Sequence, residues 1–128
     1  MLKEAALLIE QEYVKNPEEL GPRRDKALLL ALQGKHREAQ AAVPRIMEKV
    51  RRDKRYHHFT YDIARIYALD GKSEEALKWL RITVKEGFPC YTLFARDSFL
   101  DPIRKDPAFI QFMTEMKTRW EGYQREFG

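Results

Sequence analysis

Only one cysteine, Cys90, and no long run of apolar residues occur in this chain. A single cysteine excludes an intrachain disulfide framework and agrees with a reducing compartment. The longest apolar run covers residues 27–32, far short of the roughly 20 residues that span a bilayer, and glutamates interrupt the N-terminal segment where a signal peptide needs continuous apolar character. We therefore expect a cytoplasmic protein that is neither exported nor bound to a membrane.

Groups that carry catalysis or bind metals are also sparse. The chain has three histidines, and the adjacent pair His57 and His58 would point in different directions on a helix, so the two cannot share a metal ion without outside ligands. Cys90 is interpreted as a small buried apolar residue. No nucleophile with an adjacent base and no glycine-rich phosphate loop is visible. The sequence predicts a protein that is not an enzyme and that holds no metal and no cofactor.

Two Asp-Pro steps, at Asp101 and Asp106, could supply paired carboxylates for acid-base chemistry. An aspartate followed by a proline is also typical of a helix start, because the carboxylate accepts from free backbone amides and proline fits the first turn. Since no general acid or nucleophile accompanies the pair, we predict that each aspartate caps a helical segment and contributes about 1 kcal/mol.

Proline and glycine punctuate the chain at intervals that suit short helices, and apolar residues between them recur every three or four positions. The spacing predicts helices over residues 2–15, 22–33, 36–53, 57–70, 73–86 and 107–126, with short turns over residues 90–105. Pro44 is expected to bend the third helix, because it removes one backbone hydrogen bond and crowds the preceding turn. The predicted fold class is all-α.

The last predicted helix carries a continuous apolar stripe. Its members are Phe109, Phe112, Met113, Met116, Trp120, Tyr123 and Phe127. We expect this stripe to dock on the preceding helix pair as a cap, rather than to form a groove for a partner or a cofactor. Trp120 would then belong to the core, and its truncation to alanine should cost roughly 3–5 kcal/mol.

An internal repetition is the most informative feature of the chain. GKHREA, which starts at Gly34, recurs as GKSEEA, which starts at Gly71, a shift of 37 residues. Each glycine can take the left-handed conformation that ends a helix, and the alanine five residues later, Ala39 or Ala76, permits close helix contact. The repetition predicts two similar helix pairs.

These residues resemble the tetratricopeptide repeat, a pair of antiparallel helices of about 34 residues. The second copy matches the small, tyrosine, turn, small and large apolar positions of the family with Ala64, Tyr67, Gly71, Ala76 and Leu80. The first copy keeps Ala27, Leu30, Gly34, Ala39, Val43 and Ile46. The second copy departs from the family at Thr83, where alanine is usual, and at Phe88, where proline is usual.

The resemblance implies one domain over residues 1–128, built as a right-handed superhelical stack of antiparallel helix pairs with a C-terminal capping helix. An N-terminal helix takes residues 1–18, repeat one 20–54, repeat two 57–88, and short turns with the capping helix 89–128. The closing segment is similar to the C-terminal repeat regions of large bacterial signalling proteins such as serine/threonine kinases and transcription regulators. Self-association through an exposed repeat end stays an open alternative.

The resemblance also implies a function, namely binding of a protein partner, as a peptide or a helix, on a concave face lined by the first helix of each repeat. By position, the partner-binding residues are Arg24, Asp25, Leu28, His58, Tyr61, Asp62 and Arg65. Tyr61 and Arg65 are four residues apart, so we expect a ring and a guanidinium side by side as exposed contact anchors. Neither helix carries the asparagine that members of the family use, with lysine and arginine, to clamp a terminal carboxylate.

The stretch KVRRDKR, which begins at Lys49 and ends at Arg55, supports an alternative function. Five basic residues around one acid could attract nucleic acid or an acidic partner. Lysine and arginine are equally typical of a helix C-terminus, where they offset the helix dipole. Because no recognition-helix motif accompanies the stretch, nucleic-acid binding is disfavoured relative to protein binding.

Overall fold

The computed structural model describes residues 2–15, 20–53, 56–85 and 91–127; for residues 2, 20, 51–53, 56–58 and 127 it describes the backbone alone. Every regular element in these ranges is helical. The predicted all-α fold class is confirmed. Cys90 and Phe88 lie outside the described residues.

The helices begin and end close to the predicted positions. They are α1 (Leu2–Lys15), α2 (Leu20–Leu32), α3 (His36–Ala41), α4 (Val43–Asp53), α5 (Tyr56–Leu69), α6 (Ser73–Lys85), α7 (Tyr91–Arg96), the 3-10 helix η1 (Ser98–Ile103) and α8 (Pro107–Phe127). The predicted helix over residues 36–53 is interrupted at Ala42, two residues before Pro44. The interruption is the expected consequence of a proline inside a helix.

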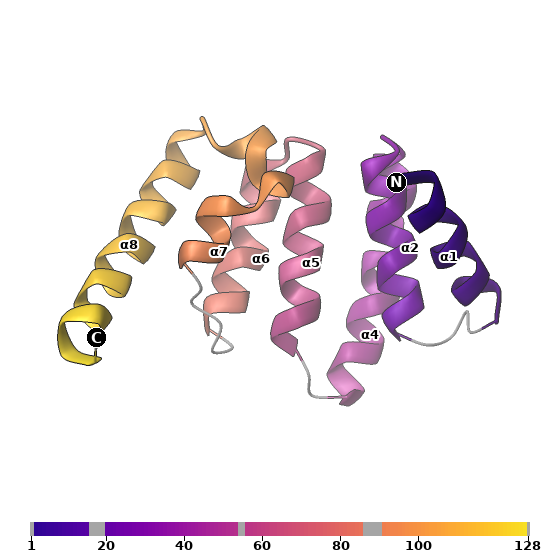
Figure 1. Cartoon of the computed structure of the whole chain (residues 1–128), viewed down its shortest axis with the longest axis horizontal. Helices are drawn as coiled ribbons and strands as arrows, with labels where there is room; N and C mark the ends of the chain where they lie inside the picture. Colours follow the sequence, from indigo (N-terminus) through magenta and orange to yellow (C-terminus); the bar gives the residue numbers. More distant parts are fainter. Residues whose placement is uncertain (1, 16–19, 54–55, 86–90, 128) are drawn as a thin grey trace.

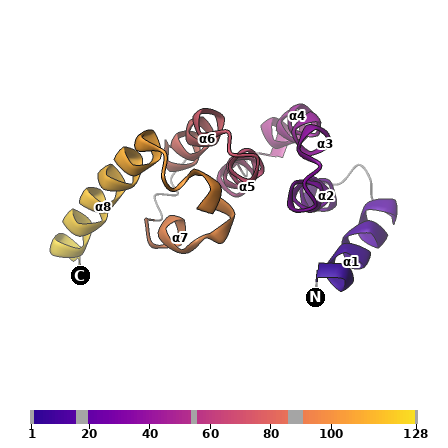
Figure 2. The ribbon, with the colours of Figure 1, turned by 90° about the horizontal axis from the view of Figure 1, so that it is seen from above.

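The helices form a curved row with α1 at one end and α8 at the other (Figure 1). Seen from above, α2 and α5 lie on the inner side of the curve, flanked by α1 and α7, whereas α3, α4 and α6 lie on the outer side (Figure 2). α2 packs on α3, and α5 packs on α6. The first helix of each pair therefore lines the inner side.

The two helix pairs turn in the same way. Gly34 and Gly71 both have the positive φ predicted for them, 81° and 72°. The amide of Lys35 donates to the carbonyl of Leu30 at 2.8 Å, and 37 residues later the amide of Lys72 donates to that of Tyr67 at 3.0 Å. Both bonds span five residues back across the helix end, as glycine-terminated helices commonly do.

Burial repeats at the same interval. Ala27 and its counterpart Ala64 are fully buried, and so are Ala39 and Ala76. Two apolar clusters result, one among α2 to α5 and one among α5 to α8, and α5 contributes residues to both. Thr83 fits in the second because its hydroxyl donates to the carbonyl of Trp79 at 2.8 Å and lies 2.9 Å from the Thr60 hydroxyl. α5 is therefore the central helix of the fold.

Two short helices, α7 and η1, occur where short turns were predicted. Asp106 caps α8 as predicted, accepting from the amide of Ala108 at 2.9 Å. Asp101 does not cap a helix, which corrects the prediction. It lies inside η1 and pairs with Arg104 at 2.7 Å, while the carboxylate of Asp97 accepts from the amide of Phe99 at 3.0 Å and begins η1.

The apolar stripe of α8 is covered over only part of its length. Phe109, Phe112 and Met116 are buried, but Trp120 and Tyr123 are 38% and 65% exposed. Trp120 is therefore not a core residue, contrary to the prediction. α8 packs on both α6 and α7, and beyond Met116 none of its described side chains is buried. The side chain of Phe127 lies outside the described residues.

Candidate functional site

A network of ion pairs joins α2, α5 and the start of η1. Arg24 pairs with Asp25 at 3.2 Å and with Asp62 at 3.3 Å, which links α2 to α5. Arg65 pairs with Asp62 at 3.1 Å and with Asp97 at 2.9 Å, which links α5 to the segment that begins η1. Two guanidinium groups thus sit among three carboxylates. The network fixes the relative positions of the elements that line the inner side of the curve.

Burial dominates the electrostatics of this network. Loss of hydration raises the pKa of Asp62, although Arg65 and Arg24 both oppose the shift. The pKa of the Tyr61 hydroxyl is raised far above its ordinary value, first by burial and second because the hydroxyl donates a hydrogen bond to Asp97. Both shifts arise first from burial of Tyr61 and Asp62, whereas Arg24, Asp25 and Arg65 keep part of their side chains exposed.

Aromatic rings cover the two arginines of the network. The guanidinium of Arg24 lies 5.0 Å from the ring centre of Phe59, and that of Arg65 lies 3.9 Å from the ring centre of Phe99. Such cation–π contacts stabilise a partly desolvated arginine by roughly 0.5–2 kcal/mol. The guanidinium of Arg65 therefore contacts Asp62, Asp97 and Phe99. The ring centre of Tyr61, on the same helix, is 5.4 Å from it.

A groove of about 190 Å³ lies beside this network and is lined by residues of α1, α2, α5 and η1. α1 supplies Ala5 and Ile9, and Arg65 and Phe99 close the groove from the opposite side. The remaining lining comes from α2, namely Asp25, Leu28, Leu29 and Leu32. Its lining is mostly apolar and includes two charged residues, Asp25 and Arg65.

The structure brings several of the sequence-predicted residues together. Asp25, Leu28 and Arg65 line the groove, and Arg24 joins the same ion-pair network. Asp62 belongs to the network but is only 9% exposed. The side chain of His58 lies outside the described residues.

The expectation that Tyr61 is an exposed anchor is wrong. Its ring does lie beside Arg65, but it is 6% exposed and stacks on Phe94 with 5.4 Å between the ring centres. The reason is that η1 packs on α5 and α7 places Phe94 against the Tyr61 ring, where plain turns were expected. Tyr61 is a core residue.

Some residues of the groove were not identified from the sequence. Leu32 is 41% exposed and lines the groove at the end of α2, and Asp97 connects Tyr61, Arg65 and Phe99. Aspartate is among the preferred N-cap residues, and this is the sequence signal that could have identified Asp97. Nothing in the chain marked Leu32 as different from the neighbouring leucines.

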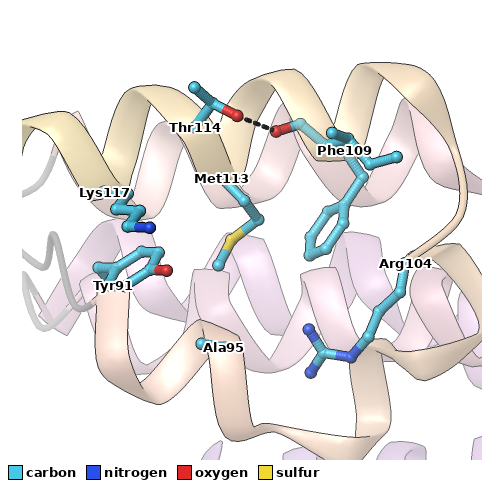
Figure 3. A pocket seen from close by; sticks show the side chains of 8 residues that line it. Tyr91, Ala95, Arg104, Phe109, Met113, Thr114 and Lys117 are labelled. Carbon is cyan, nitrogen blue, oxygen red and sulfur yellow. Dashed lines mark hydrogen bonds between the residues drawn. The ribbon is translucent and has the colours of Figure 1, made fainter.

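A second cleft, of about 300 Å³, lies between α7 and α8. Met113 projects into its middle, with Tyr91 and Phe109 on either side (Figure 3). Lys117 stands at one end and Arg104 at the other. Trp120 does not line the cleft, but its ring centre lies 5.6 Å from that of Tyr91, which does. The sequence did not predict this cleft, since the whole stripe of α8 was expected to be covered.

Comparison of the chain with protein-family models, with curated proteins and with solved structures gave no match. The likeness to tetratricopeptide repeats therefore rests on the residues of the sequence and stays a hypothesis. No cluster of potential metal ligands occurs among the described residues, and no helix in the described ranges has the length and apolar character needed to cross a bilayer. Of the basic stretch, the side chains from Arg51 to Arg55 lie outside the described residues.

Proposed function

We propose that this chain is a non-catalytic protein-interaction scaffold, a tetratricopeptide-like stack whose inner groove binds a peptide or a helix of a partner protein. The groove beside Leu28 and Leu32 carries the proposal. It opens on the face that the repeat pattern assigns to partners, and Asp25 and Arg65 are part of its lining. A cytoplasmic signalling protein is the setting that the family resemblance implies.

Repetition of structure supports the tetratricopeptide-like arrangement. The two helix pairs share a turn geometry, a hydrogen-bond pattern and buried alanines at a constant shift of 37 residues. Arrays of this kind stack neighbouring repeats into one continuous core, and their curvature produces an extended concave binding surface. The inner positions of α2 and α5 fit that surface (Figure 2).

The chemistry of the groove indicates what kind of segment it binds. Its two charged residues already have partners within the chain, because Asp25 pairs with Arg24 and Arg65 pairs with Asp62 and Asp97, so neither needs a charge from the bound segment. Ile9, Leu28 and Leu32 offer an apolar floor. An apolar side chain from the partner would therefore provide most of the binding energy, and polar groups of the lining would set its orientation.

Selection from a displayed random-peptide library against the purified chain tests this function even though the partner is unidentified. Selected peptides would be synthesised and titrated by fluorescence anisotropy against the unmodified chain and the variant Leu32→Lys. A lysine in the apolar floor should weaken binding by at least about tenfold.

Val14→Lys is the matched control, because Val14 is also an exposed aliphatic residue on a helix, at 75% exposure, but does not line the groove. It should leave the affinity within about twofold of the unmodified chain. A library that yields no binder, or binders that both variants weaken equally, would contradict the proposed function.

A further inference from the structure

The cleft between α7 and α8 is large enough to hold side chains of another molecule. Its volume of about 300 Å³ is at the lower end of the range for ligand sites, which is roughly 300–1,000 Å³. Half of the large apolar side chains that are exposed in the described ranges lie on the two helices that form it, namely Leu93, Ile110, Trp120 and Tyr123. Of these four, Ile110 lines the cleft itself, and exposed apolar side chains gathered near a cleft are typical of an interaction site.

The floor of the cleft can adapt to what enters it. Met113 is half-buried at the centre, and methionine is unbranched and polarisable, so it fits differently shaped partners. Ile110, 53% exposed, forms the rim. The hydroxyl of Thr114 already donates to the carbonyl of Ile110 at 2.9 Å, so it can only accept from a ligand (Figure 3). The floor therefore favours an apolar side chain.

The charged groups that line the cleft are both positive. Arg104 is held in place, since it donates to the carbonyls of Phe94 at 3.1 Å and Asp97 at 2.6 Å. Lys117 is 58% exposed, and the carboxylate of Glu121 is 4.0 Å from its ammonium group. The acid that pairs with Arg104 and the acid near Lys117 are not part of the lining. A ligand in the cleft thus meets a cation at each end.

From this arrangement we propose that the cleft binds an acidic amphipathic helix of a partner protein. The apolar side chains of that helix would occupy the space around Met113, and its carboxylates would meet Lys117 at one end and Arg104 at the other. The distance along α8 from Phe109 to Lys117 is about 12 Å, because eight residues rise by that amount. Acids two turns apart on the bound helix, with a pair of apolar residues between them, match this length. This site is separate from the inner groove.

Methyl NMR of the whole chain labelled at its methionines tests the proposal. The probe is a synthetic helical peptide of two to three turns, with glutamates two turns apart bracketing adjacent leucines. The Met113 methyl signal should shift saturably on titration, while the signal of Met47, which packs against the other apolar cluster, should stay in place. A peptide with lysines in place of the glutamates should bind at least about tenfold more weakly.

A charge-reversal variant at one end of the cleft distinguishes a specific loss of peptide binding from a loss of the folded structure. Lys117→Glu should weaken binding of the glutamate peptide by about tenfold and strengthen binding of the lysine peptide. Arg125→Glu is the matched control, because Arg125 is exposed on the same helix but does not line the cleft, and it should change either affinity by less than about twofold. Unchanged spectra elsewhere would show that both variants are folded.

Three outcomes would overturn the proposal. The first is the absence of a saturable Met113 shift. The second is equal affinity for the glutamate and lysine peptides, or equal effects of Lys117→Glu and Arg125→Glu. The third is a Met113 shift that depends on the concentration of the protein alone, because the cleft would then be occupied by a second copy of the chain.

Discussion

The hydroxyl of Tyr61 offers a sharp test of how the inner side of the fold is held together. Tyr61→Phe keeps the ring, and therefore the 5.4 Å stacking on Phe94, but removes the hydrogen bond that the hydroxyl donates to Asp97. A hydrogen bond to a charged group contributes roughly 1.5–3 kcal/mol. Because Tyr61 is only 6% exposed, water cannot replace the lost donor, so we expect a loss of that size in the free energy of unfolding.

Urea unfolding followed by circular dichroism measures this loss. Tyr91→Phe is the control, since the Tyr91 ring stacks on Trp120 and its hydroxyl donates to no acceptor among the described residues; it should change stability by less than about 0.5 kcal/mol. A double-mutant cycle with Asp97→Asn should give a coupling energy of about 1 kcal/mol or more. If Tyr61→Phe behaves like the control, the Tyr61–Asp97 hydrogen bond does not support the inner side as described.

Three further variants test other parts of the structure. Phe112→Ala should cost roughly 3–5 kcal/mol because Phe112 is fully buried, whereas Trp120→Ala should cost clearly less because Trp120 is 38% exposed; similar losses in urea unfolding would contradict the partial coverage of α8. Gly71→Ala should cost about 1–2 kcal/mol through its φ of 72° alone, since nothing would contact the added carbon, and an unchanged melting temperature would contradict that conformation. The pKa of Asp70 is lowered from 3.8, first by the hydrogen bond from Gln40, so its contribution to stability is complete above pH 3.8 and is lost as the pH falls through the lowered pKa. The free energy of unfolding of Asp70→Asn should therefore differ from that of the unmodified chain near neutral pH and converge with it in acid. A difference that stays constant across pH would refute the assignment.

The helices themselves could be predicted from the sequence because they depend on local signals. Gly34 and Gly71 end helices in both pairs, Pro44 interrupts a helix, and Asp106 caps one, and each of these effects acts within a few residues. The constant spacing of buried alanines reflects the same local repetition. None of these features depends on contacts between distant parts of the chain.

The burial of individual side chains on the inner side could not be predicted in the same way. Trp120 was expected in the core because it lies on an apolar stripe, and Tyr61 was expected to be exposed beside Arg65, yet Tyr61 is 6% exposed and Trp120 is 38% exposed. Asp101 and Asp97 both precede helical turns, and which of them begins η1 depends on where Tyr61 and Arg65 lie. Such outcomes are set by contacts between segments far apart in the chain.

Site-specific photo-crosslinking in the cells that produce the protein tests the inner groove as a partner-binding surface most directly. A photoreactive amino acid would replace Leu32, which lines the groove, or Val14, which does not. We expect ultraviolet light to give a defined protein adduct from position 32 and not from position 14, with the crosslinked residue of the partner apolar. Identical adducts from both positions, or no adduct from position 32, would contradict the account.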